Sequence, residues 1–242
     1  MKSSLVKLTL FAAASMALLI GFGTWQLQRL AWKEGLIERI EARAHGDPVS
    51  LAAVLRNWSQ TGDIEYQRVR LSGVFDHPGE RHLYTVVEGK PGWRIITPLK
   101  TGENEIVLVD RGYVPPSLKD PENRTAGQVR GTVTVTGFAR APGGKNAFTP
   151  ENDPARNIWY WRNHEGMAAS ILDAGSRERL VPFFVEADAA AVPGGWPKGG
   201  VTRVKFVNRH LEYAITWYGL ALALLGVYGA IIWRWRKYGE FT

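Results

Sequence analysis

Cysteine is absent from this chain of 242 residues. Without a thiol the protein can form no disulfide and no thiolate nucleophile, and it cannot hold zinc or copper through cysteine. It also lacks the C-x-x-C-H motif through which haem becomes covalently attached. Any metal site is therefore expected to rely on imidazole rather than on thiolate ligands.

Motifs for catalysis are missing as well. The sequence contains no H-E-x-x-H, no G-x-S-x-G and no glycine-rich loop of the kind that cradles phosphate. Four of the five histidines stand among polar, loop-like residues without metal-ligand spacing: His45, His77, His82 and His164. We therefore predict that the protein is not an enzyme. A membrane-tethered enzyme is the alternative, and it lacks a nucleophile, base or metal arrangement.

Long runs of basic residues are also lacking, although the chain carries a net charge of +7 from 30 basic and 23 acidic side chains. The basic residues near the two ends, Lys2, Lys7 and the cluster 234–237, flank apolar segments instead. Basic residues in such places are explained by membrane topology. We expect membrane lipid around the chain and no nucleic-acid partner.

Two apolar segments lie near the ends of the chain. Residues 213–233 are uncharged, and 21 residues in a helix cover about 30 Å, the thickness of a bilayer's hydrocarbon core. Residues 8–23 form the other apolar run. A cleavable signal peptide is the alternative for this run, but the helical pattern continues without a break through Trp25, Leu27 and Trp32. We therefore predict a retained anchor and two transmembrane helices.

The predicted topology follows from the charges of the tails. The two short tails carry five lysines and arginines against one acidic residue, which places both termini in the cytoplasm of a bacterium. The expected location is the inner (plasma) membrane, crossed by a multi-pass protein. The expected boundaries are a cytoplasmic tail over 1–7, a first transmembrane helix over 8–26, a periplasmic β-rich domain with an amphipathic linker helix over 27–210, a second transmembrane helix over 211–233 and a cytoplasmic tail over 234–242.

The middle of the chain begins with helix and then turns to strand. Residues 31–44 continue as an amphipathic linker helix until Gly46-Asp47-Pro48, and Ser50 is expected to cap a short helix through Asn57. Further on the period changes to two, so that in residues 68–75 the apolar side chains share one face. This change of period marks the start of a β-rich domain.

Similar alternating segments, separated by Gly/Pro turns, predict further strands. They are His82–Glu88, Trp93–Leu99, Ile106–Val109, Val129–Phe138, Asn157–Arg162, Phe183–Asp188 and Val201–Phe206. A helix capped by Asn163 is expected over 165–174. The predicted fold class is an α+β membrane protein in which two terminal transmembrane helices flank one antiparallel β-rich extracytoplasmic domain, a barrel or a sandwich.

Two motifs in the β-rich part resemble sites but are interpreted as structural. Asp110-Arg111 stands at a strand end before a turn, where such a pair supports the backbone more often than it catalyses a reaction. Trp159-Tyr160-Trp161 is interpreted as packing of the domain, with a ligand platform as the alternative.

One histidine, His210, stands where the second apolar segment begins. Two interpretations are open. It is a hydrogen-bonding anchor for the helix, or an axial ligand of a haem iron, which needs one neutral imidazole among apolar side chains. On a helix His210 shares a stripe with Ala214, Trp217 and Ala221. This stripe combines a ligand, a small residue that leaves room and an aromatic ring that can stack.

The end of the first apolar segment is expected at the same depth as His210. In an antiparallel helix pair, Trp25 and Gln26 lie level with it. Cations surround this mouth and pair either with haem propionates or with lipid headgroups. They are Arg29, Lys33, Lys205 and Arg209.

Small residues form a second stripe on the opposite side of the second segment. They are Gly219, Ala223, Gly226 and Ala230, with Ala14, Ala17 and Gly21 as a matching stripe on the first segment. Small residues at this spacing let helix backbones approach closely. We expect the two helices to pack through these stripes, and a partner's helix on this face is the alternative.

Fragments spread from end to end give the chain a resemblance to a known family. They are Gly23-x-Trp25-Gln26-x-x-Arg29-x-x-Trp32-Lys33, Val69-x-Leu71-x-Gly73-x-Phe75, Gly92-Trp93-Arg94-x-Ile96-Thr97-Pro98, Val109-Asp110-Arg111-Gly112-Tyr113-Val114-Pro115, Asn157-x-Trp159-Tyr160-Trp161 and Asn208-x-His210-Leu211-x-Tyr213-Ala214-x-Thr216-Trp217. In this order, with two terminal spans, they make the chain similar to the surfeit-locus family (the Surf-one type) of cytochrome c oxidase assembly proteins. Arg209 departs from the family pattern, which has a polar residue such as Asn there.

The resemblance implies an assembly factor for haem–copper oxidases that carries haem a transiently and assists its insertion into subunit I. It implies that His210 is the axial ligand of the haem iron. The other cofactor-binding residues expected are Trp217, Tyr213, Trp25, Arg29 and Arg209. The expected partners are subunit I and haem a synthase. A non-haem membrane scaffold that stabilises subunit I is the alternative function.

Overall fold

The computed structural model describes residues 2–201 and 207–239. The chain forms two compact units, one helical and one that comprises Ile40–Val204. Because the arrangement of the two units relative to one another is not determined, each is described by itself.

Two helices, α1 (Lys2–His45) and α5 (His210–Tyr238), carry the apolar segments. Both are long and apolar enough to cross a membrane. The first span and the linker helix predicted after it are one continuous helix, which ends just before Gly46 as expected. The terminal helices and the β-rich domain between them confirm the predicted fold class, an α+β membrane protein.

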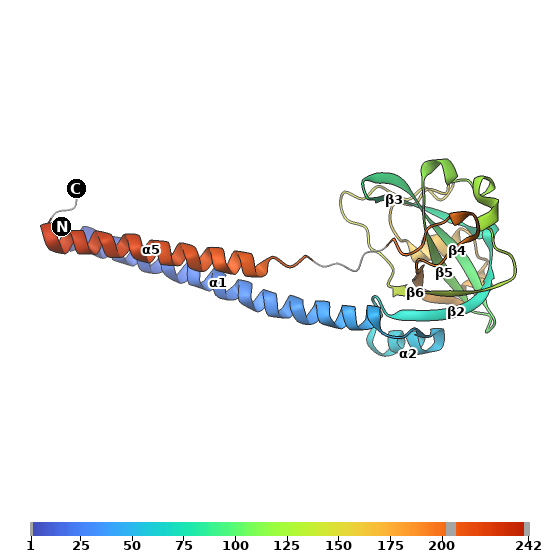
Figure 1. Cartoon of the computed structure of the whole chain (residues 1–242), viewed down its shortest axis with the longest axis horizontal. Coiled ribbons are helices and arrows are strands. Elements are labelled where there is room, and N and C mark those ends of the chain that lie inside the picture. The colour runs from blue at the N-terminus through green and yellow to red at the C-terminus, as the bar shows by residue number, and fades with distance from the viewer. Residues whose placement is uncertain (1, 202–206, 240–242) are drawn as a thin grey trace. The chain divides into compact units, whose positions relative to one another are not determined.

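Within the helical unit, α1 and α5 run side by side and antiparallel (Figure 1). The tyrosine hydroxyls of α5 bind threonines of α1: Tyr228 to Thr9 at 2.9 Å and Tyr218 to Thr24 at 3.1 Å. The less exposed residues follow a three-and-four spacing on both helices, as in a coiled-coil seam. The residues at this spacing include Ala12, Met16, Leu19, Gly23 and Gln26 on α1, and His210, Ala214, Trp217, Ala221, Leu224, Tyr228 and Ile231 on α5.

The small-residue stripes do not form this contact, so that prediction was wrong. All four members on α5 are exposed: Gly219, Ala223, Gly226 and Ala230. The matching residues of α1, Ala14, Ala17 and Gly21, are exposed too. The helices pack through the seam instead, because it alternates small residues with aromatic ones. Gly23, for example, provides the space for the ring of Tyr218. Small residues at the right spacing did not identify which face is buried.

Seven strands form the sheet of the β-rich domain. They are β1 (Val49–Ser50), β2 (Arg68–Phe75), β3 (Arg81–Val87), β4 (Lys90–Thr101), β5 (Ile106–Val114), β6 (Thr132–Arg140) and β7 (Leu180–Ala187). The helices are α2 (Leu51–Thr61), α3 (His164–Ala169) and α4 (Ala174–Arg177), with short 3-10 helices at His77–Gly79, Pro116–Leu118, Pro121–Gly127 and Pro193–Gly195. The predicted strand Val201–Phe206 lies outside the described residues from 202 onward.

Five of the strands close into a barrel, in the order β2, β6, β7, β5, β4 and back to β2. This is the connectivity of a Greek-key barrel of the OB type. Most pairs are antiparallel, as predicted, but β5 pairs with β7 and β1 with β2 in parallel. Of the two architectures expected for this domain, the structure has the barrel.

Closure of the barrel depends on a short pairing between β2 and β4, where Gly73 lies opposite Thr101 and Phe75 opposite Leu99. A Cβ atom at Gly73 would lie 2.3 Å from the carbonyl oxygen of Lys100. The two strands therefore need a residue without a side chain here.

We expect Gly73→Ala to lower the free energy of unfolding by about 1–3 kcal/mol, because the backbone of β4 has to move away. Denaturation followed by tryptophan fluorescence measures the change. Gly102→Ala is the matched control, since an added Cβ there meets nothing within 4 Å. Equal stability of the two variants would contradict the close approach.

The barrel has an apolar interior and a second apolar cluster on its outer surface. On β5 the residues alternate between the two, with Val107 and Val109 inside and Leu108 outside. The outer cluster is covered by the connection from β6 to β7, whose Trp159 and Met167 are fully buried. Trp159 is therefore a core residue, as interpreted from the sequence.

The strand predicted over Asn157–Arg162 does not form. Asn157 has a positive φ of 52° and ends a turn, so the segment makes only an isolated bridge with the sheet, between Trp159 and Leu83, and no paired strand. The Trp159 amide donates to the carbonyl of His82 at 3.0 Å. The alternation of this segment reflects one buried indole rather than a paired strand.

Helix ends follow local capping signals. Ser50 caps α2 as expected, but the helix continues past Asn57 to Thr61 because the left-handed residue that stops it is Gly62, at φ 66°. Asn163 caps the next helix as predicted, although that helix is short. Asp173 then begins a separate helix by capping the amide of Ser176, which explains why one helix over 165–174 does not form.

Candidate functional site

One candidate site is a cluster of charged side chains that project from the outer face of the barrel and are nevertheless buried. Asp110 and Glu186 are each 1% exposed. Arg94 donates from Nε to Asp110 at 2.5 Å and lies 3.2 Å from Glu186 through Nη2. Arg140 lies 3.0 Å from Glu186, and Arg162 also bonds to it. Asp110 further accepts from the amide nitrogen of Gly112 at 3.0 Å.

The carboxylates in this cluster face arginines. Burial by itself lowers the pKa of Arg94, but the nearby carboxylates of Asp110 and Glu186 outweigh it and raise the pKa overall. A carboxylate that is paired with arginines and enclosed by the sheet is poorly placed to abstract a proton from a substrate. The arrangement supports the structural interpretation of Asp110.

A second buried cluster centres on Glu80, which is 3% exposed. Its carboxylate bonds to Arg124 and accepts from Nε2 of His82 at 2.7 Å. Burial raises the pKa of Glu80, but these hydrogen bonds outweigh burial and lower it. Nearby, burial lowers the pKa of Arg111 to about 10. Arg111 donates to the carbonyl of Gly127 at 2.5 Å, so the second residue of the Asp110-Arg111 motif also supports backbone.

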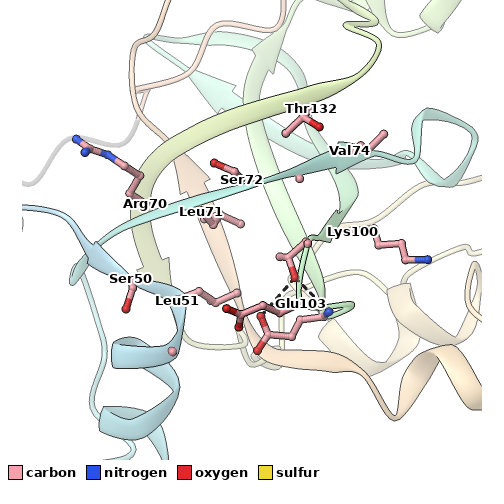
Figure 2. Close-up of a pocket in the computed structure, with 14 residues that line it drawn as sticks. Ser50, Leu51, Arg70, Leu71, Ser72, Val74, Lys100, Glu103 and Thr132 are labelled. Carbon is pink, nitrogen blue, oxygen red and sulfur yellow. Dashed lines mark hydrogen bonds between the residues drawn. The ribbon is translucent and has the colours of Figure 1, made fainter.

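A hollow of about 580 Å³ opens between β2, the start of α2 and the turn after β4. In Figure 2 the side chain of Arg70 points away from it. The two serine hydroxyls near it are already bonded. Ser50 accepts from the amide of Ala53 at 3.3 Å, and Ser72 binds Thr134 at 2.9 Å. Among the described residues no group of three or more His, Asp or Glu side chains could hold a metal ion. The contacts of these two serines do not include a base that would activate either as a nucleophile.

The start of α5 presents a different arrangement. His210 is the first residue of the helix, and its amide nitrogen lies 3.4 Å from Oδ1 of Asn208. The chain just before it is held to α1, because Nζ of Lys33 donates to the carbonyl of Val207 at 2.7 Å. These two contacts fix the backbone from which the imidazole projects.

The ring of His210 is bonded to α1 by a single short contact. Nδ1 lies 2.6 Å from Oε1 of Gln26, whose side chain is 9% exposed. The sequence indicated that Gln26 lies at the depth of His210, and the structure confirms this. The bond itself joins residues that are 184 positions apart. The sequence indicated only that the two residues lie at the same depth in an antiparallel helix pair.

The other predicted site residues lie around this pair in different surroundings. Trp25 and Tyr213 are half exposed, at 51% and 54%. Arg29 is stacked 4.3 Å over the ring of Trp32. Arg209 is exposed at the helix start, and its carbonyl accepts from the amide of Tyr213 at 3.2 Å. Lys205 lies outside the described residues.

The room expected beside His210 on its own stripe is filled. Ala214 and Ala221 are 1% and 6% exposed, because α1 packs on them. Trp217 lies against Phe22 of α1, with ring centroids 4.9 Å apart. The small residues therefore let the two helices approach, and exposed aromatic surface near the start of α5 comes from Trp25 and Tyr213.

This arrangement can supply one imidazole ligand at the edge of an apolar helix pair. Because the amide oxygen of Gln26 only accepts, the contact requires the proton on Nδ1 of His210, and in a neutral imidazole this leaves the electron pair on Nε2. A haem needs such a neutral nitrogen, apolar and aromatic surface for the porphyrin and cations for the propionates. The free Nε2, the exposed Trp25 and Tyr213 and the nearby Arg209 fit these requirements.

Comparisons with known proteins cover almost the whole chain. The model of the SURF1 family matches residues 13–222. The chain is 36% identical over 219 residues to surfeit locus protein 1 of Rattus norvegicus, covering 84% of this chain and 68% of the rat protein. It is 37% identical over 221 residues to surfeit locus protein 1 of Homo sapiens, with 84% and 70% covered, and 35% identical over 221 residues to a SURF1-like protein of Monosiga brevicollis, with 86% and 81% covered.

Proposed function

This chain belongs to the SURF1 family, and we propose on that basis that it is an assembly factor for cytochrome c oxidase that binds haem a and assists its insertion into subunit I. The observation that carries the haem-binding part is the bond between Nδ1 of His210 and Gln26, which leaves Nε2 free. In this function the haem is cargo, and the protein is not a catalyst.

His210 is proposed as the axial ligand of the haem iron. Trp25 and Tyr213 offer exposed rings for the porphyrin, while Arg209 and Arg29 offer charge for the propionates. Trp217 packs on Phe22 of α1 and contributes by holding α5 in position. When bound, the haem supplies the iron–porphyrin centre that subunit I needs.

The proposed membrane location rests on the two apolar helices. The basic residues at the ends of the chain favour cytoplasmic termini and a periplasmic β-rich domain in a bacterial inner membrane. The proposed partners are subunit I of the oxidase and haem a synthase, which would supply the cargo. Neither partner requires a nucleic-acid surface.

A second function is favoured by a separate observation. The face of α5 formed by Gly219, Ala223, Gly226 and Ala230 is exposed rather than packed on α1. Such a face lets another membrane helix approach closely. A non-haem scaffold that holds subunit I through this face is the alternative function.

The test is an optical spectrum and a pigment extraction of the full chain, purified in detergent after co-expression with haem a synthesis. Haem a is expected in the extract. A colourless protein that still co-purifies with subunit I would reject the haem-carrying function and support the scaffold. Absence of both haem and subunit I would reject the assembly role.

A further inference from the structure

Gln26 is the residue of α1 that contacts the imidazole of His210. Its Oε1 lies 2.6 Å from Nδ1, and the side chain is 9% exposed within the helix pair. A carbonyl oxygen of an amide accepts hydrogen bonds and donates none. The ring nitrogen that faces it therefore carries the proton.

A neutral imidazole has one N–H, so the proton on Nδ1 leaves Nε2 with its electron pair. We propose that Gln26 is a positioning residue, which holds His210 in the Nδ1–H tautomer and so makes Nε2 the atom that binds the haem iron. The role of Nε2 as a ligand of the haem iron rests on the proposed function, whereas the assignment of the tautomer does not.

Contacts on both helices keep this pair in place. One turn before Gln26, Gly23 lies against the ring of Tyr218, whose hydroxyl is 3.1 Å from Thr24. Lys33 donates to the carbonyl of Val207 on the other side. These contacts hold α1 and α5 together on either side of the pair, which keeps Gln26 opposite His210, as the orienting residue of a metal ligand must be.

The chemistry is that of an outer-shell partner. Histidines that bind metals almost always donate their other N–H to an acceptor, which fixes the ring and strengthens the ligand. Loss of such a partner typically weakens metal binding by about 10- to 100-fold. An amide acceptor fulfils this role without adding a charge inside the apolar helix pair.

The tautomer is measured in the haem-free full chain in detergent, with ¹⁵N-labelled histidine and spectra recorded at mildly alkaline pH. His210→Ala identifies which signals belong to this residue among the five histidines. We expect protonated Nδ1 and bare Nε2 in the wild type. In Gln26→Leu the proton is expected on Nε2, whereas Gln26→Glu, which still accepts, keeps it on Nδ1.

The matched control is Gln28→Leu, since Gln28 is the same residue type two positions away on the exposed side of α1. This variant is expected to leave the tautomer unchanged. If Gln26 had only a structural role, Gln26→Leu would alter helix stability but leave the proton on the same ring nitrogen as in the wild type.

Titration with ferric protoporphyrin IX gives the second measurement. Gln26→Leu is expected to bind it about 10- to 100-fold more weakly than the wild type or Gln28→Leu, with Gln26→Glu in between or equal to the wild type. A proton on Nε2 in the wild type, or no change in Gln26→Leu, would overturn the proposal. A wild type that binds no porphyrin would overturn the haem function, while the nitrogen signals still decide the tautomer.

Discussion

Glu186→Ala is expected to lower the free energy of unfolding of the β-rich domain by about 3–5 kcal/mol, the cost typical of removing one partner from a buried ion cluster. Glu186 is 1% exposed and meets Arg94 at 3.2 Å and Arg140 at 3.0 Å, and it also bonds to Arg162. After its loss, Asp110 still faces Arg94 and Arg162.

The size of this effect comes from the arginines that remain. Buried arginines that lose one of their carboxylates keep their desolvation cost with less compensation for it, so removal of the acid costs more than the ion pairs contribute in the intact protein. Chemical denaturation of the full chain in detergent, followed by tryptophan fluorescence, measures the change. The variant is expected to unfold at a much lower denaturant concentration with a similar slope.

Glu151→Ala is the control for this measurement. Glu151 forms an ion pair with Lys145, but its side chain is 77% exposed. Pairs in such surroundings contribute about 0–1 kcal/mol. If the two variants lost similar amounts of stability, the cluster around Glu186 would be solvated and the structural account of it would be wrong.

His210→Ala is expected to lower the haem content of the purified protein by more than about 100-fold, beyond the effect expected for an outer-shell residue such as Gln26. The reason is that the helical unit contains no second histidine. Hydrophobic surface alone then has to hold the porphyrin, without a bond to iron. Pigment extraction and the optical spectrum measure the loss.

Two further variants make this result specific. His45→Ala removes an exposed histidine at the end of α1, whose Nδ1 contacts the carbonyl of Glu41 at 2.9 Å, and should leave the haem content unchanged. His210→Gly, supplied with free imidazole, should regain the spectrum of the wild type, because the free molecule can occupy the place of the lost ring. Full haem occupancy in His210→Ala would refute the ligand assignment.

Much of the local structure could be predicted because it depends on neighbouring residues. The alternation of residues 68–75 matches β2, with Val69 and Leu71 buried. Ser50 and Asn163 cap helices as expected. The predicted helix length was wrong where a stop signal further along the chain ended the helix. For α2 this signal is Gly62, and the helix does not end at Asn57. Each of these signals acts over a few residues.

Pairings between distant residues could not be predicted in this way. The barrel closes where Gly73 meets the backbone of Lys100, and β5 and β7 pair in parallel across a connection of many residues. The small residues of α5 suited a helix contact by spacing, yet the buried face is the one with Ala214 and Ala221. A helix has several faces that can pack, and the partner's side chains determine which one does.

The sequence by itself determined the class of the protein: two apolar helices, a β-rich domain between them, no cysteine chemistry and one histidine at the start of the second helix. Only the tertiary structure decided what that histidine can do. The proton of an imidazole goes to the nitrogen that faces an acceptor, and the acceptor is Gln26, 184 residues away on α1. Sequence spacing reports depth along a helix, whereas a hydrogen bond requires the position of both atoms.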